Sequence, residues 1–302
     1  MCGLSGDHAG GFRSVIATVA HLFGCYNPEV SRLRVAAISF LNTVPLMYDF
    51  EHAPQREGLA ERFDVHYTLP SLCAEELRAG TSDIGIVPVA AYTTIPDLWI
   101  LPGVAIAAKH PVRSILLVSK RELREVRSVG TDTSSRTSVA LLRLLFDRQF
   151  GLNPEFVSEE PELDRMMANH DAALLIGDPA LRVNIADGKY RYVDLAEEWQ
   201  RMTGLPFVFA FWALRGEAIE LARVSDAVAV FQRSRDAGLL HAGELARKEA
   251  GRYGTTPELA LEYLTQHIDY TLDEQNIAGL RLFFRYATEC GALQPAPELR
   301  FL

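Results

Sequence analysis

The chain has 302 residues, 48% of them hydrophobic, and is therefore long enough to bury the core of one large domain or of two smaller ones. Its 39 acidic residues outnumber its 30 basic residues, and the basic residues form no cluster. This balance argues against a nucleic-acid partner, because binding phosphates requires a basic face.

The four cysteines, Cys2, Cys25, Cys73 and Cys290, are scattered and form no C-x-x-C pair. This distribution is typical of reduced thiols in a cytoplasmic protein rather than of a disulfide framework or a zinc site. No run approaches the roughly 20 apolar residues that a transmembrane helix needs. The sequence therefore predicts a cytoplasmic protein that binds no membrane and no metal.

Residues 1–32 precede the first strand pattern. Within them, FRSVIATVAHLFGC (12–25) loosely resembles a lipoprotein signal, which would make the protein an exported one. His21 interrupts the apolar stretch, and Phe23 is a poor residue before such a cleavage site. We therefore expect a poorly ordered extension ahead of a domain that begins near Leu33.

From Leu33 onward, apolar strand patterns alternate with helical ones. Strands are expected, in chain order, at 33–40, 63–69, 82–90, 99–109, 112–120, 127–132, 154–160, 171–181 and 205–215. Helices are expected at the end of 42–51, at 70–80, after 132, at 162–170 and through most of the chain from Glu217. In the helix at 70–80, Ser71 is the expected N-cap and Gly80 the expected end.

Strands that alternate with helices predict an α/β fold with mainly parallel sheets. The order of the elements suggests two lobes, the first formed by 33–112 plus 207–302 and the second by 113–206. The chain has no Gly/Ser-rich linker, so we expect it to cross a hinge twice. Ligands of open α/β sheets bind beyond the carboxyl ends of strands. The candidate contacts are therefore the strand-end loops at 39–43, 87–92, 131–138, 176–181 and 203–209.

The loop at 131–138, TDTSSRTS, holds six hydroxyl residues and Arg136 where a helix begins, with Thr133 or Ser134 as its N-cap. A helix N-terminus attracts anions, and each hydrogen bond to a charged acceptor contributes about 1.5–3 kcal/mol against about 0.3–1 for the helix dipole. Two or three such bonds would hold a carboxylate. The alternative is a well-capped helix with a polar start, but surplus hydroxyls lower helix propensity without helping the fold.

Four further polar residues have two interpretations each. Asn42 follows the first strand and is either a turn residue or a ligand contact. Asp178 either caps a helix ahead of Pro179 or belongs to a site, and Arg113 and Ser114, near the expected lobe crossing, are equally open.

Several catalytic motifs are missing from the sequence. It contains no G-x-G-x-x-G, G-x-x-x-x-G-K-[ST], G-x-S-x-G or H-E-x-x-H, and none of its eight histidines falls in the five loops. The sequence thus does not support a nucleotide, metal or acyl-enzyme mechanism.

Six motifs resemble, in order and spacing, the chorismate dehydratases of the futalosine route to menaquinone, over residues 33–290. They are AISFLNTVPL, DIGIVPVAAY, LPGVAIAAKHPVRSILLVS, VGTDTSSRTSVALLRLLF, ALLIGDPAL and DLAEEWQRMTGLPFVFAFWA. The resemblance implies a two-lobed α/β fold like the type II periplasmic binding proteins, a ligand cleft between the lobes, a cytoplasmic location and no cofactor. The implied reaction removes water from chorismate to give 3-[(1-carboxyvinyl)oxy]benzoate. Many relatives carry an acidic residue where this chain has Ala90-Ala91, so no carboxylate role transfers there.

The resemblance also organises the candidate site. We expect one carboxylate to bind at the second lobe, through Ser134, Ser135, Arg136 and Thr137. Ser39 and Asn42 approach from the first lobe, where Asn42 orients the leaving hydroxyl or a carboxylate. The remaining expected contacts are Val89, Arg113, Ser114, Gly177, Asp178, Pro206 and Phe207, the last four as the cleft wall. The general base is either Asp178 or the substrate's own enolpyruvyl carboxylate.

Three other functions remain open. A solute receptor for a small carboxylate would share the fold but requires export. The later naphthoate-forming enzyme of the same route would require a histidine in the cleft. A ligand-sensing regulatory domain would need a helix-turn-helix segment, and none precedes Leu33.

Overall fold

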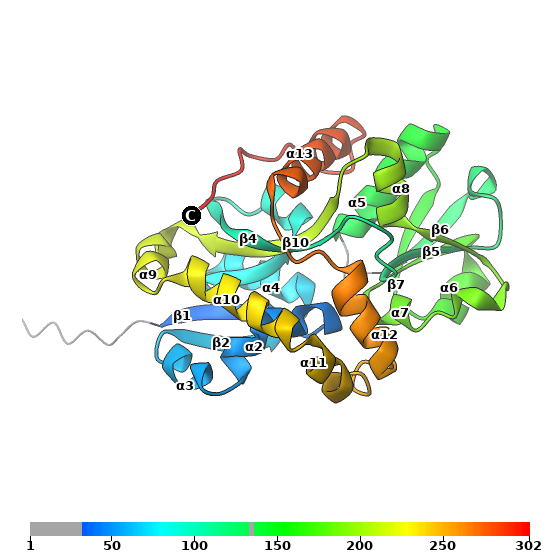
Figure 1. Cartoon of the computed structure of the whole chain (residues 1–302). Helices are drawn as coiled ribbons and strands as arrows, with labels where there is room; N and C mark the ends of the chain where they lie inside the picture. Colours follow the sequence, from blue (N-terminus) through cyan, green and yellow to red (C-terminus); the bar gives the residue numbers. More distant parts are fainter. Residues whose placement is uncertain (1–31, 133–135) are drawn as a thin grey trace, which may run out of the picture. The chain divides into compact units, whose positions relative to one another are not determined.

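The computed structural model describes residues 32–132 and 136–302. The predictions for the N-terminal extension, and those for Ser134 and Ser135, therefore lie outside the described residues, apart from Arg32 at the end of the extension. Two five-stranded sheets with helices packed on them form the described chain (Figure 1). This arrangement confirms the expected two-lobed α/β fold.

The first sheet has the strand order β2-β1-β3-β10-β4 and draws on segments from both ends of the chain. Its strands are β1 (Leu33–Ile38), β2 (Phe63–Thr68), β3 (Ile84–Pro88), β4 (Leu98–Ala108) and β10 (Phe207–Arg215). The second sheet has the order β7-β6-β8-β5-β9. Its strands are β5 (Ile115–Ser119), β6 (Ser128–Asp132), β7 (Glu155–Glu159), β8 (Ala172–Ile176) and β9 (Arg191–Asp194). The sheets use the segments predicted for the two lobes, whose bounds at 112 and 206 stay a prediction.

Helices and single helical turns connect the strands. Before β5 they are η1 (Leu41–Met47), α2 (Tyr48–Glu51), α3 (Gln55–Ala60), α4 (Pro70–Ala79) and η2 (Val89–Thr93). Between β5 and β10 they are η3 (Leu123–Glu125), α5 (Arg136–Leu145), η4 (Phe146–Phe150), α6 (Leu163–Asn169), α7 (Gly177–Leu181), η5 (Ile185–Asp187) and α8 (Leu195–Thr203). After β10 follow η6 (Gly216–Ala218), α9 (Ile219–Val224), α10 (Ala227–Leu240), α11 (Ala242–Glu249), α12 (Pro257–Glu262), η7 (Tyr263–His267) and α13 (Glu274–Glu289). None of these described helices has the length and apolar character needed to cross a membrane.

Four of the five strands in each sheet run in the same direction, which agrees with the prediction of mainly parallel sheets, and one strand in each sheet is reversed. In the first sheet β1 runs parallel to β2 and β3, whereas β10 runs antiparallel to β3 and β4. In the second sheet β5 is the antiparallel strand, between β8 and β9. The reason is connectivity: β5 and β10 are the first strands after the two crossings. Both strands enter their sheets from the side where β3 and β8 have their carboxyl ends, and they therefore run in the opposite direction to those strands.

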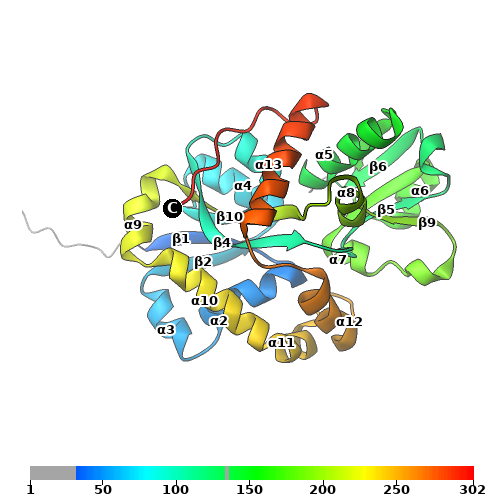
Figure 2. The same ribbon diagram turned by 45° about the horizontal axis from the view of Figure 1, so that its top comes forward.

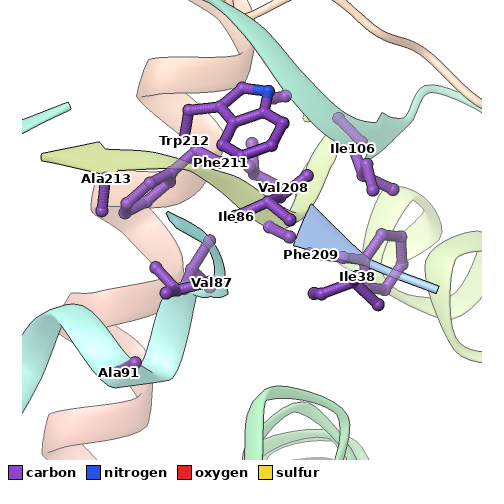
Figure 3. Close-up of a cluster of buried hydrophobic side chains, with 14 of the residues drawn as sticks. Ile38, Ile86, Val87, Ala91, Ile106, Val208, Phe209, Phe211, Trp212 and Ala213 are labelled. Atoms are coloured by element: carbon purple, nitrogen blue, oxygen red, sulfur yellow. The ribbon is translucent and has the colours of Figure 1, made fainter. Parts of the chain in front are cut away.

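The strand β10 is buried on both faces, as its continuous apolar sequence predicts. On one face the Trp212 ring packs on Phe231 of α10, with ring centroids 4.6 Å apart, and on the other Phe211 meets Tyr92 of η2 at 5.8 Å. Figure 3 shows this cluster and places Phe209 next to Ile38, at the end of β1. The core therefore extends to the carboxyl end of β1.

The second sheet is sandwiched between two pairs of helices. Leu116 and Val118 of β5 share a small apolar cluster with Met166 of α6 and Ala180 of α7. Leu117, which points to the other face, belongs to the main core together with residues of α5 and α8. The alternation along β5 thus fixes which helices cover which face.

The ends of α4 show which turn signals were decisive. Gly80 ends this helix in a left-handed conformation, with φ 74°, as predicted. The N-cap is Leu69, and Pro70 is the first helical residue, so the prediction that Ser71 caps the helix is wrong. Proline suits the first position because its fixed φ is already helical and its missing N–H is not needed there.

The helix α10 crosses η1, the turn that carries Asn42, at very close range (Figure 2). The Ser234 hydroxyl donates to the Leu46 carbonyl at 2.8 Å and accepts from the Asp49 amide at 3.0 Å. A Cβ atom on Gly238 would lie 2.0 Å from the Pro45 carbonyl oxygen, which is backbone and cannot rotate away. Only glycine permits this approach, so α10 fixes the position of η1.

The crossings between the sheets are joined by one buried carboxylate. Asp194 caps α8 by accepting from the amides of Ala196 and Glu197, and it also accepts from the Arg113 amide at 2.7 Å. Arg113 has φ 65°, a backbone conformation that residues other than glycine rarely adopt. The bonds to Asp194 hold it in this conformation and fix the segment that leads into β5.

We expect Gly238→Ala to lower the free energy of unfolding by about 1–3 kcal/mol, because the added methyl group must push η1 away from α10. The matched control is Gly58→Ala in α3, where a Cβ meets nothing within 4 Å. That control should gain roughly 0.5–1 kcal/mol from helix propensity. Urea unfolding measures both variants, and a Gly238→Ala protein as stable as the wild type would contradict the close packing.

Candidate functional site

A cavity with about 600 Å³ of open space, including its mouth, lies where β1, β3 and β8 end and where β5 and β10 begin. Five of its described lining residues carry neutral hydrogen-bonding side chains, namely Asn42, Thr43, Ser114, Thr137 and Ser138. The others are Ile38, Phe40, Pro70, Pro88, Ile106, Val112, Ile115, Ile176, Gly177, Phe209, Ala210 and Ile268. None of these described residues is charged. The cavity thus combines apolar walls with neutral polar groups, at the strand ends where a ligand was expected.

Asn42 and Ser114 are joined through a tyrosine from the C-terminal part of the chain. The Asn42 Nδ2 donates to the phenol oxygen of Tyr263 at 3.2 Å, and that phenol donates to the Ser114 Oγ at 2.9 Å. The Thr43 hydroxyl donates to the Asn42 Oδ1 at 3.4 Å. Tyr263 is 2% exposed, and this burial raises the pKa of its phenol, which therefore stays protonated.

Thr137 lies at the second position of α5 and connects it to the first sheet. Its Oγ1 accepts a hydrogen bond from the Ala90 amide of η2 at 3.1 Å. The Ala90 amide thus joins the first turn of α5 to η2 beside the cavity.

Asp178 is buried directly behind the cavity wall. The helix α7 begins at Gly177 and has Ile176 as its N-cap, so the interpretation of Asp178 as the helix cap is wrong. The carboxylate instead accepts from the Leu41 amide of η1 at 3.4 Å. Burial raises the pKa of Asp178 to about 6.

The structure brings four of the predicted residues to the cavity wall and places others nearby. Asn42, Ser114, Thr137 and Gly177 line the cavity. Ser39 lines an adjoining hollow, where it accepts from the Arg252 guanidinium at 3.2 Å.

Three further predicted residues do not line the cavity as the structure describes it. Val89 is fully buried in the core, next to Pro88. Arg136 is exposed and lines a second hollow that shares Pro70 and Pro88 with the cavity. The Arg113 side chain does not line the cavity. Its Nη1 is buried with no hydrogen-bond partner among the described residues.

Pro206 and Phe207, expected in the wall, belong to the core between α8 and α13. The Trp199 indole donates to the Pro206 carbonyl at 3.0 Å, and the Phe207 ring packs on Phe283 at 4.9 Å. Phe209 lines the cavity in their place. The expected loop therefore reaches the cavity two residues later, after β10 has already begun.

Sequence reasoning missed Tyr263 and Ile268 altogether. Both lie in the C-terminal part of the chain, beyond the strand-end loops that supplied the candidates. Nothing in their local sequence distinguishes them from core residues of an amphipathic helix. The packing of η7 beside η1 brings Tyr263 to two lining residues, and Ile268, directly after η7, lines the cavity itself.

A model of the family described as menaquinone biosynthesis matches residues 33–289. The chain belongs to the menaquinone biosynthesis family. This membership confirms the resemblance indicated by the six sequence motifs. A chorismate dehydratase of Thermus thermophilus is 32% identical over 260 residues, which are 81% of this chain and 91% of that protein. A chorismate dehydratase of Campylobacter jejuni is 25% identical over 173 residues, covering 57% of this chain and 63% of its own length.

Solved structures share the fold of this family member at low identity. A crystal structure from Archaeoglobus fulgidus has a TM-score of 0.68 and 18% identity, covering 87% of this chain and 98% of its own. The periplasmic aliphatic sulphonate binding protein of Escherichia coli has a TM-score of 0.63 and 18% identity, with 90% and 93% covered. These likenesses confirm the periplasmic-binding-protein-like fold.

The raised pKa of Asp178 makes stability depend on pH. The folded protein holds this proton up to about pH 6 and the unfolded chain only to about pH 4. The Asp178 carboxyl therefore costs no stability below pH 4 and lowers the free energy of unfolding as the pH rises to 6. Asp178→Asn removes the cost of the buried charge and should raise the free energy of unfolding at pH 7.5 by roughly 1–3 kcal/mol.

Urea unfolding of both proteins from pH 4 to 7.5 checks this expectation, and the difference between them should vanish at pH 4. Asp164→Asn, at an exposed carboxylate of α6, is the control and should show no such trend. A difference that stayed constant across this range would contradict the assignment.

Proposed function

We propose that this protein is a chorismate dehydratase, which removes water from chorismate to give 3-[(1-carboxyvinyl)oxy]benzoate. The cavity carries the proposal, because it offers an apolar slot for a ring and neutral donors for carboxylates. The similarity to the chorismate dehydratase of Thermus thermophilus, over 91% of that protein, supports it. A biosynthetic role of this kind fits a cytoplasmic protein.

The lining residues match the two parts of chorismate. Phe40, Ile176 and Phe209 would contact the cyclohexadiene ring, while Asn42, Ser114 and Thr137 would bond its carboxylates and its hydroxyl. Each hydrogen bond to a carboxylate contributes about 1.5–3 kcal/mol, so a few neutral donors suffice without a buried cation. Such donors also avoid the desolvation cost that a buried charge would add.

The carboxylate site at the second lobe remains as proposed from the sequence. Thr137 lies in the first turn of α5, where backbone amides favour an anion. Ser134 and Ser135 precede it in the chain and would add donors. Arg136, in the adjoining hollow, would attract the dianion toward the mouth rather than bond it inside.

The reaction proceeds by loss of a proton and then of hydroxide. A base takes the proton from the ring carbon that bears the enolpyruvyl ether, and the electron pair delocalises toward the ring carboxylate. The neighbouring carbon then expels its hydroxyl, which leaves as water, and the ring becomes aromatic. Aromatisation drives the step, so the protein has to orient the substrate and stabilise the developing charge, and no cofactor is required.

We assign the base to the substrate's own enolpyruvyl carboxylate. Asp178 accepts from the Leu41 amide and is not among the described residues that line the cavity, which favours the substrate carboxylate as the base. Asn42 would orient the leaving hydroxyl. Its amide is held by Thr43 and Tyr263, which leaves one N–H for the substrate.

The direct experiment is to incubate the purified protein with chorismate, without added metal or nucleotide. We expect a product lighter by one water molecule with the absorbance of a substituted benzoate. Unchanged chorismate would refute the proposal, and tight binding without turnover would instead indicate a receptor for small carboxylates.

Asp178→Asn should retain turnover of chorismate, because the amide oxygen still accepts from Leu41 and the substrate supplies the base. Steady-state rates measure this, with binding of chorismate followed by calorimetry. General bases contribute about 100-fold or more to the rate. A loss of that size with unchanged chorismate binding would make Asp178 the base.

A further inference from the structure

Tyr263 does not line the cavity, yet it contacts two residues that do. Its phenol bridges Asn42 of η1 and Ser114 at the start of β5, which belong to segments of different sheets. We propose that Tyr263 is a positioning residue, which orients the Ser114 hydroxyl and the Asn42 amide so that both donate a hydrogen bond to the bound substrate. This inference deepens the proposed dehydratase function and rests on it.

The direction of the hydrogen bonds carries the inference. An amide nitrogen only donates, so the Tyr263 oxygen accepts from Asn42 and its single hydrogen must go to Ser114. The Ser114 oxygen is therefore an acceptor toward Tyr263, and its own hydrogen finds no acceptor among the described residues. In a chain of this kind each bond polarises the next one. Ser114 is left as the terminal donor, at the wall of the cavity.

Asn42 is oriented by the same phenol. With its Oδ1 accepting from Thr43 and one hydrogen of Nδ2 given to Tyr263, the amide cannot flip without breaking both bonds. Its second N–H remains for an acceptor in the cavity. One tyrosine thus fixes two donors that face the same space.

The backbone supports these side chains from the other side. The carbonyl of Ser114 accepts from the Gly177 amide at 2.7 Å, and the preceding amide of Arg113 is held by Asp194. Because Ser114 cannot move as a whole, the rotation of its hydroxyl is the remaining freedom. The hydrogen bond from Tyr263 removes this freedom. Burial raises the pKa of the Tyr263 phenol, so the phenol stays protonated and remains a donor.

A second buried tyrosine provides a matched comparison. Tyr270 lies in the same C-terminal segment and is 3% exposed, against 2% for Tyr263. Its hydroxyl has no hydrogen-bond partner among the described residues. Packing in this segment therefore accepts a phenol without using its hydroxyl, whereas the hydroxyl of Tyr263 joins two cavity residues.

The test compares Tyr263→Phe with Tyr270→Phe, using chorismate as substrate. We expect Tyr263→Phe to lower kcat/KM by roughly 10- to 100-fold, since a lost buried partner leaves two donors unoriented. Tyr270→Phe should change kcat/KM by less than about twofold, because no hydrogen bond is lost. Thermal unfolding of both variants shows whether either substitution disturbs the fold.

A double-mutant cycle with Ser114→Ala separates positioning from general loosening. If Tyr263 acts in part through Ser114, the double variant loses less activity than the product of the two single losses, because the shared interaction is already gone and only the effect on Asn42 is added. Independent effects that multiply would overturn the inference. So would a Tyr263→Phe protein that matches Tyr270→Phe in kcat and KM while the wild type turns over chorismate. A wild type that neither binds nor converts chorismate would refute the proposed function and this inference with it.

Discussion

Neutral hydrogen-bond donors in an apolar cavity are the constraint on which the rest of this structure depends. Such donors bind an anion well only when they already point at it, and each one left unpaired in a buried wall costs about 1–3 kcal/mol. The architecture meets this requirement from several directions. The helix α10 presses on η1 through Gly238, Asp194 holds the segment ahead of Ser114, and Ala90 holds Thr137. Orientation, rather than charge, is what the fold supplies.

The directions of β5 and β10 make both sheets mixed, and both directions result from the way the chain crosses between the sheets. Once β4 has carried the chain out of the first sheet, β5 can enter the second sheet only from the shared edge, and β10 returns in the same way. Carboxyl ends of some strands and amino ends of others therefore lie on the same side of the sheets. That is why the cavity is lined by the ends of β1, β3 and β8 together with the starts of β5 and β10.

Much of the fold could be predicted from local sequence. Apolar runs gave the strands, Gly80 gave a helix end, and six motifs gave the family. The direction of β10 could not be predicted, because strand patterns carry no polarity. Ser71 was displaced as N-cap by the stronger preference of Pro70 for the first helical turn. Local signals that compete are settled by small differences in backbone preference.

The candidate site was predicted only where it follows strands. Asn42, Thr137 and Gly177 lie in loops after strands, where the general rule for α/β sheets found them, whereas Ser114 was a candidate because it lies near the lobe crossing. The prediction for Pro206 and Phe207 failed because both pack into the core between α8 and α13, and Phe209 lines the cavity instead. The positioning residue Tyr263 carries no local sequence signal, since its contacts form only when distant segments pack together.

The order of these residues along the chain has a consequence for biosynthesis on the ribosome. Every polar side chain that lines the cavity in the described ranges has been made by the time Ser138 is added, whereas the tyrosine that aligns two of them is made much later, in η7. A nascent chain halted before η7 would hold all of these ligand-facing groups without their alignment. The alignment of these groups thus depends on a segment that is synthesised after all of them.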